Sequence, residues 1–104
     1  MYYVLGTTEE IQNPALLQEY TDRFLPILQR HQGTILALDE AVHAKEGHWP
    51  YVRTVLLAFP SARHAQDWYN SPEYQEIAIL RNMAAVMNLV FIRGLGEPVI
   101  ASAA

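Results

Sequence analysis

The sequence predicts one α+β domain whose elements follow the order β-α-β-β-α-β around a single antiparallel sheet. Short segments rich in branched and aromatic residues are typical of strands. Between them lie stretches whose apolar residues recur at helical spacing. A chain of 104 residues is long enough to bury one modest core without disulfides or metal ions.

Four strands are expected, and the third is the most informative. It is apolar on both faces, since Val55 and Leu57 alternate with Leu56 and Ala58. In so short a chain the helices can cover only one face of a sheet, so a second copy of the chain is expected to cover the other. The predicted strands are residues 2–7, 35–38, 52–59 and 86–92, with polar connections at residues 8–13 and 39–51.

The first helix is predicted from its cap and from its apolar face. Asn13 caps it and Pro14 is its first residue, a position where a missing N–H costs nothing. Pro26 inside the helix predicts a kink or an early end, because its ring cannot donate to the preceding turn. The apolar face extends as far as Gly33 and comprises Leu17, Tyr20, Phe24, Ile27, Leu28 and His31.

The segment 59–81 identifies the fold most clearly. It is predicted to contain the end of a strand, a helix carrying Trp68 and Tyr69, a break at Asn70, and a second helix opened by Ser71. Together with the strands, this order predicts a ferredoxin-like unit over residues 2–94. Residues 95–104 form a tail of small residues that is expected to fray or to lie against a neighbouring subunit.

Composition argues against several classes of function. The net charge is −4 and the seven basic residues are scattered, so nucleic acid is not an expected partner. No segment approaches the ~20 apolar residues of a membrane span, and the protein is expected to be cytoplasmic. The absence of cysteine excludes disulfide and thiolate chemistry. A hydrophobic content of 51% is high for a small monomer and favours an oligomer.

No cofactor and no metal site are expected. The nucleotide-binding and hydrolase motifs with glycine-rich or histidine spacing are missing from the sequence. His43, Glu46 and His48 lie within six residues, but Gly47 disfavours the helix that would align them on a metal ion.

Arginines are the clearest candidates for binding a ligand. Arg81 falls on the apolar face of its helix, where an unpaired guanidinium is costly. It would bind a ligand carboxylate, pair internally with an acidic residue, or extend to the rim. Arg53 opens the third strand and points either toward the helices or subunit interface, or into water at the strand end.

Five further residues are candidates for the functional site, and each of them also has a purely structural interpretation. Trp68 is a core residue or a pocket wall. Tyr20 and Tyr74 lie on apolar helix faces and either handle a proton or satisfy their hydroxyls on the backbone. His43 is a general base or an ordinary surface histidine. Asn88, the polar residue inside the fourth strand, either faces a pocket or bonds a neighbouring strand.

The chain resembles a bacterial family known as domain of unknown function 1330. The resemblance rests on Phe59-Pro60-Ser61, on the run Trp68-Tyr69-Asn70-Ser71-Pro72-Glu73-Tyr74, and on Leu80-Arg81, with looser matches at Tyr20, Pro26, Gly33, Arg53 and residues 46–49. Where the family often has two glycines, this chain has Gln32-Gly33. The resemblance implies a dimeric α/β barrel, a homodimer of ferredoxin-like units packed sheet against sheet. It also implies a pocket formed by Tyr20, Arg53, Trp68, Tyr74 and Arg81.

Three functional hypotheses follow. The first is a small-molecule enzyme or binder with a helix–sheet pocket for an anionic or aromatic ligand. The alternative is a non-catalytic dimerisation or ligand-sensing module. The third is a cofactor-free monooxygenase or haem-degrading enzyme, because the wider superfamily includes such enzymes and Asn88, Trp68 and His64 are of the types that the haem-degrading members use.

Overall fold

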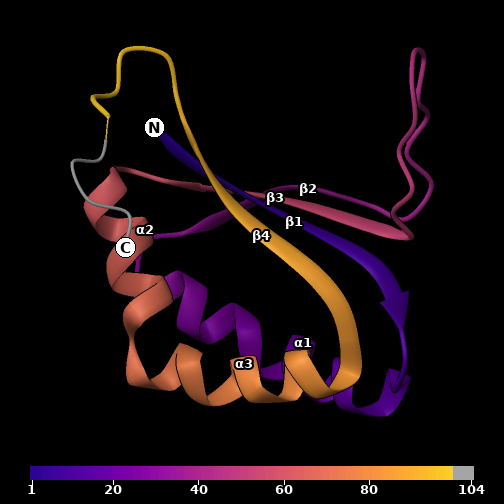
Figure 1. Ribbon diagram of the computed structural model, residues 1–104. Helices are drawn as coiled ribbons and strands as arrows, with labels where there is room; N and C mark the ends of the chain where they lie inside the picture. The colour runs from indigo at the N-terminus through magenta and orange to yellow at the C-terminus, as the bar shows by residue number, and fades with distance from the viewer. Residues whose placement is uncertain (100–104) are drawn as a thin grey trace.

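The computed structural model describes residues 1–99 and contains seven elements in one domain (Figure 1). The predicted order of strands and helices is confirmed, with the second helical region divided into two helices as expected. The elements are β1 (Tyr2–Ile11), α1 (Pro14–Arg30), β2 (Thr34–Asp39), β3 (Arg53–Phe59), α2 (Ala62–Asn70), α3 (Pro72–Ala84) and β4 (Ala85–Arg93).

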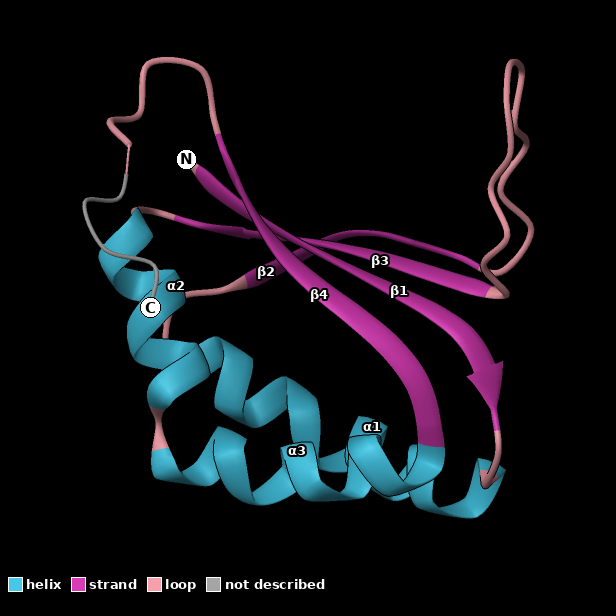
Figure 2. Ribbon diagram, in the orientation of Figure 1, coloured by secondary structure: helices cyan, strands magenta, loops and turns pink. Residues whose placement is uncertain are grey.

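The four strands form one antiparallel sheet in the order β2-β3-β1-β4. Figure 2 shows all three helices on the same side of this sheet. A central β1 and β3 flanked by β4 and β2 is the arrangement of a ferredoxin-like unit, so the predicted α+β fold class is confirmed.

The first strand is longer than predicted. The segment expected to be a connection continues the strand to Ile11, because Glu10 and Ile11 pair with Val86 and Ala85 of β4. A register shift between Thr8 and Glu10 marks an irregularity in this ladder. The polar residues at this end of β1 gave no sign in the sequence that the strand continues to pair with β4.

Helix α1 begins as predicted but does not end early. The backbone N–H of Leu16 donates to the Asn13 side chain at 3.2 Å, which confirms the cap. The helix continues through Pro26 to Arg30. Ile27 and Leu28 follow the proline and are buried in the core, and this packing holds the last turn in place although proline cannot donate its backbone bond.

Ser71 ends α2 and begins α3. Its hydroxyl accepts from the backbone N–H of Tyr74 at 3.2 Å and donates to the carbonyl of Trp68 at 2.8 Å. The side chain is buried, so both bonds are shielded from water. The predicted break and restart of the helix are therefore built around one residue.

The core lies between the helices and the inner face of the sheet. Val4, Leu57 and Phe59 of the sheet are fully buried against the helices. Gly33 is required for close packing, because a Cβ there would lie 2.3 Å from the Leu28 Cδ1 atom and 2.8 Å from a ring carbon of Phe59. The turn before β2 therefore tolerates only glycine without rearrangement.

The outer face of the sheet is apolar and is not covered by any of the described elements. Val90 and Ile92 of β4 are 48% and 43% exposed, and Val90 is the cross-strand neighbour of Leu5. Leu5 in turn pairs with Leu56 of β3 on the same face. Among residues 1–99 no helix has the length and apolar character needed to cross a bilayer.

The segment after β4 is only partly described. Residues 94–99 turn back toward the chain start, and the Glu97 carboxylate pairs with the N-terminal ammonium of Met1 at 2.8 Å. Residues 100–104 lie outside the described part of the chain, so the prediction for the end of the tail stands as a prediction.

Candidate functional site

A cavity of about 110 Å³ lies between α1, α2 and the inner face of the sheet. Its walls are mostly apolar, and its polar residues are Thr8, Tyr20, Thr21 and Arg53. The apolar residues around it are Leu17, Phe24, Ile35, Leu38, Val55, Leu57, Trp68, Met87 and Leu89, with Gly6 in the floor.

Gly6 explains why the sheet leaves this space open. It lies on the inner face of β1, opposite Val55 of β3 and Leu89 of β4. A Cβ at this position would lie 2.9 Å from a methyl group of Val55. The missing side chain therefore contributes directly to the volume of the cavity.

The cavity opens along the edge of the sheet formed by β2. Ile35 and Leu38 line the cavity and are also 40% and 53% exposed. The helices do not extend far enough to cover this edge strand. The exposed side of the cavity is therefore the side at β2.

Behind the cavity, two tyrosine hydroxyls and a guanidinium form a hydrogen-bonded chain. The hydroxyls of Tyr20 and Tyr74 lie 3.0 Å apart, and Arg81 Nη1 donates to the Tyr74 hydroxyl at 2.8 Å. Tyr20 lines the cavity, whereas Tyr74 and Arg81 lie behind it on α3. No acidic residue in the described part of the chain forms an ion pair with Arg81, so the internal carboxylate pair weighed from the sequence is not what holds it.

The direction of the bond between Arg81 and Tyr74 is fixed, because the guanidinium can only donate. The Tyr74 oxygen accepts from Arg81, and either hydroxyl can be the donor in the bond between Tyr74 and Tyr20. When Tyr74 donates to Tyr20, the Tyr20 hydrogen is left for an acceptor on the cavity side. Hydrogen bonds in such a chain polarise one another, so a cation at one end strengthens the donor at the other.

Both hydroxyls stay protonated at neutral pH. Burial raises the pKa of Tyr20 well above the ordinary value for tyrosine, and the neighbouring Tyr74 raises it further. Burial also raises the pKa of Tyr74, although Arg81 opposes this by favouring the charged form. The pair therefore acts through hydrogen-bond donation and does not supply a base near neutral pH.

Arg53 is the cationic residue of the cavity wall. It begins β3 directly opposite Thr8 of β1 and is partly buried. Its guanidinium forms no hydrogen bond or ion pair with another residue of the described chain. Arg53 is thus free to bind an anionic group, which the sequence allowed but did not require.

Trp68 belongs both to the core and to the cavity wall. It is fully buried, with its ring centroid 4.3 Å from that of Tyr74 and 5.4 Å from that of Phe59. Its indole N–H has no hydrogen-bond acceptor among the described residues. Buried polar groups usually find a partner, so this N–H is an unsatisfied donor within the core beside the cavity.

Two predicted site residues lie away from the cavity. His43 is exposed in the loop between β2 and β3, which projects from the end of the sheet away from the helices (Figure 1). Asn88 lies on the outer face, where its amide donates to Thr7 at 3.2 Å and to Glu9 at 2.9 Å. The placement of Asn88 in the helix–sheet pocket is wrong, and the alternative of a bond to a neighbouring strand is confirmed.

The Asn, Trp and His residues considered for a haem-degrading site do not lie together in the structure. His64 lies on α2 four residues before Trp68, and its Nδ1 atom forms a hydrogen bond of 2.7 Å with the Ser61 hydroxyl. Asn88 is separated from both by the sheet. Of the predicted residues, the structure brings Tyr20, Arg53 and Trp68 to one cavity and connects Tyr74 and Arg81 to it through hydrogen bonds.

Sequence reasoning missed Gly6 and Thr8. Thr8 is almost fully buried on the inner face between Arg53 and Met87. A single glycine inside a strand is a known sign of close backbone approach or of missing packing, so Gly6 carried a usable signal. Thr8 carried no such signal in the sequence, because it was predicted to lie in a connection between elements.

Comparisons with known proteins identify a family and a shared fold. The family model described as "Domain of unknown function (DUF1330)" matches residues 1–95. A search of curated proteins gives no significant match. Among solved structures, an ethd-family protein from Bacillus halodurans aligns with a TM-score of 0.66 at 12% identity, over 91% of this chain and 99% of that one.

Two further structures show the same likeness. A NIPSNAP domain protein from Burkholderia xenovorans aligns with a TM-score of 0.58 at 15% identity, over 95% of this chain and 100% of that one. A protein titled antibiotic biosynthesis monooxygenase aligns with a TM-score of 0.54 at 14% identity, over 91% and 99% of the two chains. At these identities the likeness is one of fold.

The tyrosine pair predicts a distinctive alkaline titration. Of the six tyrosines, Tyr20 should form tyrosinate only well above pH 10, the ordinary tyrosine value, and Tyr74 should also do so above it, because the pKa of each is raised. Because their pKa values are raised in the folded state, the stability they contribute is complete below about pH 10 and is lost as the pH rises through the folded values. Tyrosinate absorbance and unfolding should be followed together. Simultaneous ionisation of all six tyrosines near pH 10 in the folded protein would contradict the buried pair.

Proposed function

The chain belongs to the DUF1330 family, and we propose that it binds a small, largely apolar molecule in the helix–sheet cavity and polarises an oxygen atom of that molecule. The hydrogen-bonded chain from Arg81 through Tyr74 to Tyr20 is the observation that carries this proposal. The Arg81 guanidinium is partly buried and is held on the Tyr74 hydroxyl behind the cavity. Its effect is to present a strengthened donor to the cavity.

The groups around the cavity define the ligand. Tyr20 and Arg53 line the cavity, and both side chains carry hydrogen-bond donors. The ligand therefore carries at least one acceptor oxygen, and a carboxylate or phenolate suits the charge of Arg53. The remaining walls are apolar and aromatic, which suits a hydrocarbon body.

The volume sets the size of that body. Engineered cavities of about 150 Å³ hold a benzene molecule, so a cavity of about 110 Å³ fits a fragment of up to roughly one ring. The exposed β2 edge allows the polar end of a longer ligand to extend outward. A simple benzoate, phenol or short branched acid is the expected class.

The chemistry that this arrangement supports is stabilisation of negative charge on the ligand oxygen. Preorganised donors in a site with little water lower the energy of an enolate or phenolate. The raised pKa of Tyr20 keeps its hydroxyl in the donating form throughout the physiological range. His43, the general-base candidate from the sequence, is exposed in the loop and takes no part in this proposal.

The uncovered face of the sheet favours a second property, association with another copy of the chain. Leu5, Leu56 and Val90 form a continuous apolar row across three strands of the outer face. Such a face is unusual on a monomer of this size. Packing of two outer faces would bury it and would leave the helix–sheet cavity of each copy on the far side of its own sheet.

The binding proposal is tested with a thermal-shift panel of benzoates, phenols and quinols, followed by calorimetry on any ligand that raises the melting temperature. Arg53→Gln should weaken binding of a carboxylate by about 10-fold or more, because a charged hydrogen bond is lost. Tyr20→Phe should weaken the same ligand by a similar factor.

The matched control for both variants is Arg23→Gln, which removes an exposed arginine of α1 that pairs with Glu76 outside the cavity. It should leave the affinity unchanged. Equal affinities for the native protein, Arg53→Gln and Tyr20→Phe would show that the ligand binds elsewhere.

The association proposal predicts a particle of twice the chain mass in light scattering at micromolar concentration. Val90→Lys places a charge in the apolar row and should produce monomers. The control Met83→Lys places the same charge at an exposed position on α3 and should leave the dimer intact. A native protein that is monomeric at ~100 μM would contradict the proposal.

A further inference from the structure

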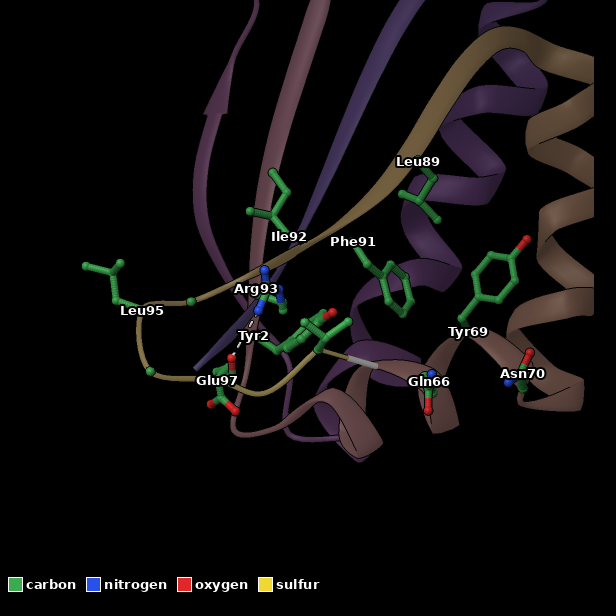
Figure 3. A pocket seen from close by; sticks show the side chains of 13 residues that line it. Tyr2, Gln66, Tyr69, Asn70, Leu89, Phe91, Ile92, Arg93, Leu95 and Glu97 are labelled. Atoms are coloured by element: carbon green, nitrogen blue, oxygen red, sulfur yellow. Dashed lines mark hydrogen bonds between the residues drawn. The ribbon is translucent and has the colours of Figure 1, made fainter. Parts of the chain in front are cut away.

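A second and larger hollow of about 970 Å³ lies at the other edge of the sheet, beside β4. Its outer wall is the segment of residues 94–99, which we call the strap (Figure 3). None of Tyr20, Arg53, Trp68, Tyr74 and Arg81 lines this hollow. It is therefore separate from the cavity of the proposed function, and its occupancy does not depend on that proposal.

One wall of the hollow is aromatic. The Phe91 ring lies 6.2 Å from that of Tyr69 and 6.2 Å from that of Tyr2, edge to face in both cases. Figure 3 shows Tyr69 of α2 and Phe91 of β4 facing the same space. Tyr69 is 36% exposed, and its hydroxyl has no hydrogen-bond partner among the described residues. A wall of this kind suits the face of a planar, apolar molecule.

Two charged residues line the hollow, Arg93 and Glu97. The Glu97 carboxylate is neutralised by the N-terminal ammonium of Met1 at 2.8 Å. Arg93 has no carboxylate partner among the described residues, and its one hydrogen bond is a long contact of 3.5 Å with the backbone oxygen of Glu97. One guanidinium is thus left to bind an anion, and a carboxylate matches its two-pronged geometry.

The strap is held against the body at its first residue. A Cβ on Gly94 would lie 2.2 Å from the carbonyl oxygen of Met1, so the backbone passes too close for any other residue. This contact and the ion pair between Met1 and Glu97 hold the strap near the chain start at two of its residues, Gly94 and Glu97. The hollow is consequently present before a ligand arrives.

We propose that the hollow under the strap is a binding site for a planar aromatic carboxylate, with the ring system against Tyr69 and Phe91 and the carboxylate on Arg93. A volume of about 970 Å³ is in the range of sites for drug-sized ligands. It admits two or three fused rings, whereas the helix–sheet cavity holds roughly one. The two sites therefore select ligands of different size.

The experiment uses 2-naphthoate as the probe, with calorimetry and NMR on the whole chain. We expect saturable binding, with intermolecular contacts between the naphthalene protons and the rings of Tyr69 and Phe91. Arg93→Gln should weaken the affinity by about 10-fold or more through loss of a charged hydrogen bond. Arg63→Gln, an exposed arginine on α2 outside the hollow, is the matched control and should change nothing.

The outcomes separate the two sites. Loss of 2-naphthoate affinity in Arg53→Gln, with Arg93→Gln unchanged, would assign the ligand to the helix–sheet cavity and overturn the second site. Lack of saturable binding by the native protein up to ~5 mM would overturn it as well. Contacts to Tyr69 and Phe91 that persist with unchanged affinity in Arg93→Gln would refute the role of the carboxylate.

Discussion

The hydrogen bonds of Ser71 are the constraint on which the site depends. One buried hydroxyl ends α2 by donating to Trp68 and starts α3 by accepting from Tyr74. This corner fixes the angle between the two short helices and brings the Trp68 and Tyr74 rings to 4.3 Å from each other. From there the Tyr74 hydroxyl reaches both Tyr20 of α1 and Arg81, about two turns further along α3. A different corner would remove Tyr74 as the acceptor of Arg81 and leave the guanidinium, among the described residues, only its bond of 3.2 Å to the side-chain oxygen of Asn82.

Most of the polar groups at or behind the helix–sheet cavity are hydrogen-bond donors. Arg53, Arg81 and the Trp68 indole can only donate, and the raised pKa values of Tyr20 and Tyr74 keep both hydroxyls protonated. Buried donors without acceptors are costly, which is why an acceptor oxygen is the group that such a site binds best. The arrangement favours recognition and charge stabilisation over proton transfer. The hydrogen-bonded chain from Arg81 to Tyr20 lies behind apolar walls. The low dielectric there strengthens each of its hydrogen bonds.

The sequence predicted the fold well because its signals are local. The Asn13 cap, the break at Asn70 and the restart at Ser71 depend on a few neighbouring residues, and all three are confirmed. The prediction from sequence failed where the structure of a segment depends on a pairing partner far along the chain. Residues 8–11 are an example, because they form a strand only through their pairing with β4. The site was predicted in part for the same reason. Helix faces identified Tyr20, Trp68, Tyr74 and Arg81, but strand periodicity alone could not tell which face the helices cover, and Asn88 was placed on the wrong one.

The central claim is that Arg81 acts on the ligand through Tyr74 and Tyr20 and not by direct contact. A double-mutant cycle of Arg81→Met and Tyr20→Phe, with ligand affinity as the readout, tests it most directly. The account predicts that Arg81→Met weakens binding in the native background and has no further effect once Tyr20 is phenylalanine. Independent, additive losses from the two changes would contradict the hydrogen-bonded chain as the element that defines the site.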